Sequence, residues 1–167
     1  MKTFAIISLV VFAGFILLGI KRFGLLRSYS AFASKWDEAV PIKKMNLWSI
    51  VTLVVAFLLM IPMIDAGDGN KWQFLGFFAP VYLAVVAFTP KFETDPKQHK
   101  IHVFGASACA LIASLWLVLV QHLWWVALIS LAVMAAAAYF TKTWKTSYIF
   151  WLEMTLFAAV YAAVIFF

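Results

Sequence analysis

Six long apolar runs constrain the fold of this chain more than any other feature. They are separated by short polar segments and cover residues 3–20, 47–64, 72–89, 101–120, 123–140 and 147–167. An α-helix rises about 1.5 Å per residue, so roughly 17–25 apolar residues cross the hydrocarbon core of a bilayer. With 66% apolar and 12% charged residues among 167, the chain has more apolar surface than one small water-soluble core buries. We predict an all-α, polytopic transmembrane helical bundle of about six spans.

The stretch 101–140 is almost unbroken and needs a turn to fit this scheme. As one straight helix it would be about 60 Å long, twice the thickness of the hydrocarbon core. Gln121 and His122, at its midpoint, are the only strongly polar residues in its interior, and Trp124 and Trp125 follow closely. Aromatic side chains of this kind gather at membrane surfaces. The sequence therefore predicts a tight helical hairpin here, within one bundle that takes in the whole chain.

The distribution of basic residues predicts the orientation. Eleven lie after the first, third and fifth runs, and the two others are Lys2 and Lys71. Because Lys and Arg accumulate in cytoplasmic loops, we expect those three loops in the cytoplasm and both termini outside. The same placement between apolar runs argues against a nucleic-acid partner. We expect a multi-pass membrane location, and a bacterial inner membrane is the simplest one for so compact a bundle.

The first loop, residues 21–46, contains four apolar residues with helical spacing: Leu25, Tyr29, Phe32 and Trp36. Steps of four, three and four place them on one helix face. This face predicts an amphipathic segment on the cytoplasmic leaflet, with four basic residues near anionic head groups: Arg27, Lys35, Lys43 and Lys44. The alternative, which we favour as regards function, is an ordinary basic loop.

Glu153 is the most informative single residue, because it lies inside the last apolar run. An ionised carboxylate that faced lipid there would cost several kcal/mol. The side chain must therefore face the bundle interior, pair with another group or stay protonated. We favour a site for a ligand, an ion or a proton; the alternative is a structural hydrogen bond between helices.

His99 and His102 are neighbours on one helix face at the start of the fourth run. Together with Glu153 they supply three possible zinc ligands, which would leave a fourth position open. However, Glu153 lies about two turns deeper, and the usual i, i+4 spacing of helix-borne histidine ligands is absent. We expect no cofactor and keep zinc as the alternative. In the alternative without metal, His99 is solvated and His102 forms a hydrogen bond at the membrane interface.

Small residues follow His102 along the fourth run. Ala106, Ala110 and Ser114 repeat every four residues, which gives a helix face that another helix can approach closely. A helix with so little bulk lies centrally in a bundle or lines a cavity. Since His102 shares this side with Ala106, we expect it to point toward protein.

Six spans, His102 with Gly105 in a His-x-x-Gly pattern and Glu153 early in the last span resemble the DRAM/Frag-type membrane proteins. The resemblance implies a six-span layout but little chemistry. It makes a partnership between His102 and Glu153 an expectation.

Three functions are compatible with the sequence. The first is a protein that binds or moves a lipid-like or small ligand, or an ion, through a cavity between spans four and six, with Glu153 as polar anchor and His102 as partner. The second is an intramembrane enzyme with a metal held by His99, His102 and Glu153. The third is a non-catalytic subunit that assembles with other spans or with itself. Loops this short build no soluble active site, so catalysis is not favoured.

Overall fold

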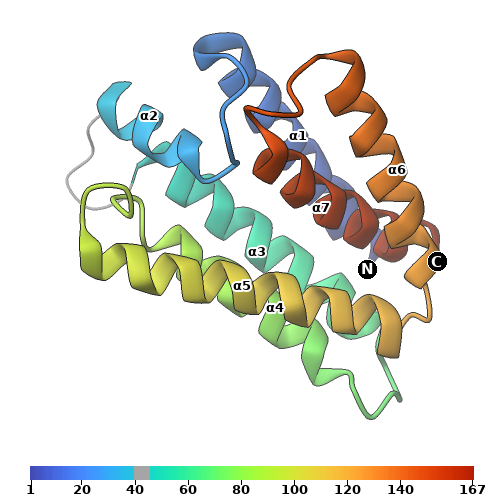
Figure 1. The fold of residues 1–167 in the computed structure, drawn as a ribbon. Helices are drawn as coiled ribbons and strands as arrows, with labels where there is room; N and C mark the ends of the chain where they lie inside the picture. The colour runs from blue at the N-terminus through green and yellow to red at the C-terminus, as the bar shows by residue number, and fades with distance from the viewer. Residues whose placement is uncertain (40–45) are drawn as a thin grey trace.

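The computed structural model describes residues 1–39 and 46–167, which form seven α-helices (Figure 1). The helices are α1 (Lys2–Phe23), α2 (Ala31–Ala39), α3 (Leu47–Asp65), α4 (Phe74–Ala87), α5 (Pro96–Leu119), α6 (Trp124–Phe140) and α7 (Tyr148–Phe166). No strand occurs in either described range. The prediction of an all-helical chain is confirmed, and each of the six apolar runs overlaps one helix.

Four helices, α1, α3, α5 and α7, are long and apolar enough to cross a membrane. The other two apolar helices, α4 and α6, have only 14 and 17 residues. At 1.5 Å per residue α4 is about 21 Å long, which is shorter than the hydrocarbon core. It ends early because Pro90 lacks an N–H and disfavours helix in the residue before it. The structure therefore supports a membrane protein with four clear spanning candidates.

Five of the helices surround one interior (Figure 1). Helices α3, α4 and α5 pack side by side in chain order, α1 packs on α3, and α7 contacts both α1 and α5. Helix α6 lies outside this group and packs mainly on α7. A single hydrophobic core runs through the bundle. The bundle is thus closed by α7, which contacts α1 and α5 less extensively than α4 contacts α3 and α5.

The predicted turn lies where the sequence placed it, between the end of α5 and the start of α6. The two helices do not pack against each other as a tight hairpin, because α6 packs on α7 instead. His122 adopts a left-handed backbone with φ of 55°, a conformation that reverses the chain where glycine is absent. The Leu123 N–H donates to the Leu117 carbonyl at 2.9 Å. Gln121 Nε2 donates to the Ala66 carbonyl at 2.8 Å and so joins this turn to the end of α3.

The amphipathic segment of the first loop differs from the prediction. Helix α2 includes Phe32 and Trp36, whereas Leu25 and Tyr29 precede it. Tyr29, Phe32 and Trp36 are buried in the core, with exposed fractions of 3%, 0% and 3%. The Trp36 ring stacks on Phe15 of α1 at 5.7 Å. Helical spacing identifies an apolar face but not what covers it, and here the bundle covers this face instead of lipid head groups.

Four basic residues of the first loop were predicted to lie near anionic lipid head groups, and the structure describes two of them. Lys43 and Lys44 lie outside the described residues. The side chains of Arg27 and Lys35 are 65% and 45% exposed, and they form ion pairs with Glu93 and Glu38. Their contact with anionic head groups stays a prediction.

Candidate functional site

The segment 24–30, which we call the strap, connects α1 to α2 and positions the site. Gly24, with φ of 77°, ends α1, and the chain reverses its direction there. The Arg27 carbonyl accepts the N–H of Phe150 at 3.0 Å. That N–H belongs to the first turn of α7, where backbone donors lack partners within the helix. The strap thus binds the start of α7.

Tyr29 fixes the strap to α3. Its hydroxyl lies 2.7 Å from Thr52 Oγ1, and Thr52 Oγ1 donates to the Trp48 carbonyl at 2.7 Å. Because the single Thr52 hydrogen is used there, the Tyr29 hydroxyl is the donor to Thr52. Burial raises the pKa of Tyr29 above its ordinary value, so the hydroxyl keeps its proton. The position of the Tyr29 backbone is therefore fixed.

Glu153 lies in the second turn of α7, directly beside the strap. Its Oε2 accepts the Tyr29 N–H at 2.5 Å. Among the described residues, no group forms a hydrogen bond with the other carboxylate oxygen. The side chain is partly buried. The burial of Glu153 is thus offset by a hydrogen bond from a backbone N–H rather than by a charged side chain. Its second carboxylate oxygen remains available to accept a hydrogen bond from a ligand.

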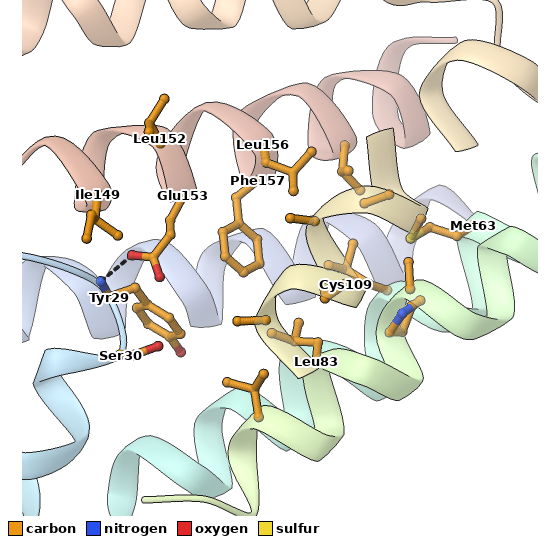
Figure 2. Close-up of a pocket in the computed structure, with 18 residues that line it drawn as sticks. Tyr29, Ser30, Met63, Leu83, Cys109, Ile149, Leu152, Glu153, Leu156 and Phe157 are labelled. Carbon is orange, nitrogen blue, oxygen red and sulfur yellow. Dashed lines mark hydrogen bonds between the residues drawn. The ribbon is translucent and has the colours of Figure 1, made fainter. Parts of the chain in front are cut away.

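A cavity of about 220 Å³ begins at Glu153 and extends between α5 and α7, with α3 and α4 as its floor. In Figure 2, Glu153, Tyr29 and Ser30 lie at one end and Met63 at the other. Apart from Tyr29, Ser30, Glu153 and the weakly polar Cys109, every residue that lines the cavity is apolar. The cavity therefore has one polar end and an apolar body.

The small side chains of α5 create this space. Ala106, Cys109, Ala110 and Ala113 line the cavity, whereas Gly105 faces α4, where an added Cβ would lie 3.2 Å from a Val86 methyl group. The small-residue face predicted from the sequence therefore serves in part as a cavity wall. Close packing on α4 uses the neighbouring face.

His102 lies away from the cavity and from Glu153. It is buried, as expected, but its Nδ1 lies 2.8 Å from Thr89 Oγ1 and its ring stacks on Phe92 at 3.9 Å. Since Thr89 Oγ1 donates to the Val86 carbonyl at 2.6 Å, His102 Nδ1–H is the donor to Thr89. His102 does not line the cavity. The expected partnership of His102 with Glu153 is not formed.

His99 is also separate from Glu153. Its Nδ1 lies 3.2 Å from the Phe92 carbonyl and donates to it, and its ring stacks on Phe92 at 6.4 Å. Within residues 1–39 and 46–167, no three His, Cys, Asp or Glu side chains are placed to hold one metal ion. The structure does not bring His99, His102 and Glu153 together as ligands.

No family model matches this sequence, and comparisons with curated proteins and with solved structures find no match either.

Residues 29 and 30 are the part of the site that the sequence did not indicate. Tyr29 and Ser30 lie about 120 positions before Glu153 in the chain, and no spacing rule joins such distant segments. The one signal was the tyrosine itself, which the helical spacing assigned to an apolar face. The structure shows in addition that the Tyr29 backbone N–H donates a hydrogen bond to Glu153.

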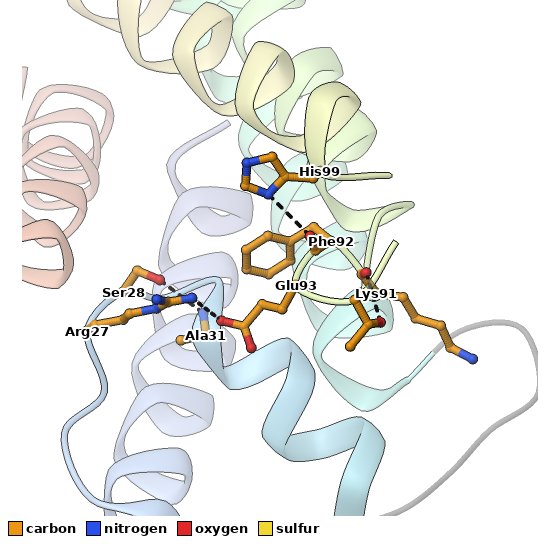
Figure 3. A network of polar contacts seen from close by, with 8 residues as sticks. Arg27, Ser28, Ala31, Lys91, Phe92, Glu93 and His99 are labelled. Carbon is orange, nitrogen blue, oxygen red and sulfur yellow. Dashed lines mark hydrogen bonds and ion pairs between the residues drawn. The ribbon is translucent and has the colours of Figure 1, made fainter. Parts of the chain in front are cut away.

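The strap also contacts the connection between α4 and α5 (Figure 3). The Arg27 guanidinium pairs with Glu93, whose side chain is 28% exposed. Burial alone would raise the pKa of Glu93, but hydrogen bonds from Ser34 and Arg27, with the positive charges of Arg27 and Lys35, lower the pKa below its ordinary value. One residue, Arg27, thus joins α7 through its carbonyl and the α4–α5 connection through its side chain.

The Glu93 ion pair predicts a small, pH-dependent contribution to stability. Because the folded-state pKa is lowered, the contribution is complete above the ordinary value of 4.5 and is lost as pH falls through the folded-state pKa. We expect Glu93→Gln to lower the free energy of unfolding at pH 7 by no more than about 1 kcal/mol, because the pair is partly exposed and screened. Unfolding curves at pH 7 and pH 3 check this. A difference that grows on acidification would contradict the assignment.

Proposed function

We propose that the chain is a six-span membrane protein with both termini outside, and that a bacterial inner membrane is its location. Large apolar side chains on the outer surface support contact with lipid; among them Val10, Leu17, Phe57 and Leu111 are 66%, 67%, 60% and 61% exposed. Inclusion of α4 and α6 as short spans makes the number of crossings six. Short hydrophobic segments are accommodated by thinning of the bilayer and by flanking residues.

Contacts between loops support the same orientation. The first, third and fifth loops carry eleven of the thirteen basic residues. Arg27 of the first loop contacts Glu93 of the third, and its carbonyl binds Phe150 just after the fifth. Loops that touch one another lie on one side of a membrane, and the basic content favours the cytoplasm.

Within this bundle, the function we propose is binding of a small amphipathic ligand in the cavity between α5 and α7. The polar head would contact Glu153, and the apolar body would lie along Cys109 and Phe157. The observation that carries this proposal is the free carboxylate oxygen at the polar end of an otherwise apolar cavity. Apolar pockets with a few converging polar groups are the usual form of ligand sites.

The size of the cavity is adequate for such a ligand. An apolar protein cavity of about 150 Å³ holds a benzene molecule, and this one measures about 220 Å³. From Glu153 to Val160, which both line it, α7 rises about 10 Å. A slender apolar chain therefore fits better than a globular solute.

The other two functions receive less support. A zinc enzyme would need His99, His102 and Glu153 at one place, and they are apart. The subunit role stays an alternative, and the resemblance to DRAM/Frag-type proteins adds no residue of the observed site except Glu153.

Photolabelling tests the proposed function. The probe is a long-chain alcohol with a diazirine near the end of its chain, used with protein in phosphatidylcholine nanodiscs. We expect saturable labelling within the cavity segments 109–113 and 156–160, at the residues that line the cavity: Cys109, Ala110, Ala113, Leu156, Phe157 and Val160. Ala110→Phe, which adds a phenyl ring to the cavity wall, should lower this labelling roughly tenfold, equivalent to about 1.4 kcal/mol.

Leu111→Phe is the matched control, because Leu111 is the next residue on α5 and is 61% exposed on the outer surface. It should leave labelling of the cavity segments unchanged. Labelling spread evenly over the outer faces, or equal effects of the two variants, would overturn the proposal.

A further inference from the structure

We propose that the cavity selects ligands with a cationic ammonium head, and that its ligand class is the single-chain lipophilic amine. This inference rests on the proposed ligand-binding function and adds the chemistry of the head group.

The charges around the cavity favour a cation. Glu153 is the one acidic side chain that lines it, and no Lys, Arg or His is among its described lining residues. The nearest strap cation, Arg27, pairs with Glu93 and is 65% exposed. A carboxylate or phosphate head would therefore meet Glu153 without a countercharge, and like charges repel strongly where the dielectric constant is low. An ammonium head would neutralise Glu153.

The hydrogen-bonding capacity of Glu153 also favours a ligand that donates, whereas the Ser30 hydroxyl at the same end of the cavity can donate or accept. With a cation bound beside it, Glu153 is ionised and only accepts hydrogen bonds, and the one donor from the described part of the protein that reaches it is the Tyr29 N–H. The Tyr29 hydroxyl donates its single hydrogen to Thr52 and therefore cannot donate to a ligand. An ammonium N–H directed at the free oxygen would form a charge-assisted bond, which is stronger than the bond an uncharged hydroxyl forms.

Aromatic rings flank the carboxylate. Figure 2 shows Glu153 beside the Tyr29 ring and Phe157, two rings that contact each other edge to face with centroids 6.0 Å apart. The faces of such rings attract cations at distances up to about 6 Å. A neutral or anionic head gains nothing from them. The apolar wall beyond Cys109 accommodates an alkyl chain but offers no second polar group.

Competition with the diazirine alcohol tests the inference in neutral phosphatidylcholine nanodiscs. Unlabelled dodecylamine, dodecanol and dodecanoate compete at equal concentrations in the membrane. We expect dodecylamine to displace the probe at about tenfold lower concentration than dodecanol, and dodecanoate to be the weakest competitor. In Glu153→Gln, dodecylamine and dodecanol should become equivalent within about twofold, since glutamine keeps an acceptor for Tyr29 but has no charge.

The outcomes separate the two proposals. If dodecanol competes and dodecylamine is no better, the cavity binds ligands but the ammonium preference is wrong. If no amphiphile competes for labelling of the cavity segments, the proposed function itself fails. If Glu153→Gln does not fold, the order of the three competitors on the unaltered protein still decides. Equal competition by amine and carboxylate would overturn the inference.

Discussion

Gly76→Ala should destabilise the bundle strongly, because the backbones of α3 and α4 touch at this position. A Cβ on Gly76 would lie 2.6 Å from the Met63 carbonyl oxygen and 2.8 Å from its carbon. Both are backbone atoms, so the clash cannot be relieved by a side-chain rotation. The Met63 carbonyl also accepts the Trp116 indole N–H at 3.2 Å, and separation of α3 from α4 would disturb this bond to α5. We expect a loss of about 3 kcal/mol in the free energy of unfolding.

Titration with sodium dodecyl sulfate, followed by circular dichroism, measures this loss. Gly14→Ala is the matched control, because Gly14 lies in α1 with nothing within 4 Å of an added Cβ. It should be neutral or slightly stabilising, since alanine favours helix over glycine. Equal stability of Gly76→Ala and the unaltered protein would contradict the close approach of α3 and α4.

The helices were predictable from the sequence because apolar length and polar interruption are local properties. Gln121 and His122 were sufficient to place the turn between α5 and α6. The start of α5 was less accurate: the apolar run begins at Ile101, whereas the helix begins at Pro96. Asp95 caps the helix by accepting the N–H groups of Lys97 and Gln98, so α5 extends through polar residues that an apolar criterion leaves out.

The site was only partly predictable. Glu153 and the small residues of α5 were identified because their chemistry is unusual in an apolar segment. The role of the Tyr29 backbone was not, because any residue has an N–H and only the path of the strap aims this one at Glu153. His102 was assigned to the wrong partner. Its nearest acceptor, Thr89, lies 13 positions away in the preceding connection, and helix spacing does not extend across such a turn.

The position of Glu153 is open to direct chemical measurement. Six of the seven acidic residues lie outside the apolar cores of the spans: Asp37, Glu38, Asp65, Asp68, Glu93 and Asp95. Glu153 alone lines an apolar cavity. A lipophilic carbodiimide partitions into hydrocarbon, whereas a charged, water-soluble carbodiimide stays in the aqueous phase. We therefore expect the first reagent to modify Glu153 in preference to the other six, and the second reagent to modify the other six but not Glu153.

Mass spectrometry of the peptide that contains Glu153 is the measurement that decides the central claim. In nanodiscs, the account predicts nearly complete modification by dicyclohexylcarbodiimide and none by the water-soluble reagent, with Glu153→Gln as the blank. Ala110→Phe should slow the reaction, because it narrows the route to the carboxylate, and Leu111→Phe should not. Modification of Glu153 by the water-soluble reagent as fast as that of Glu38 would place the carboxylate in water and contradict the account.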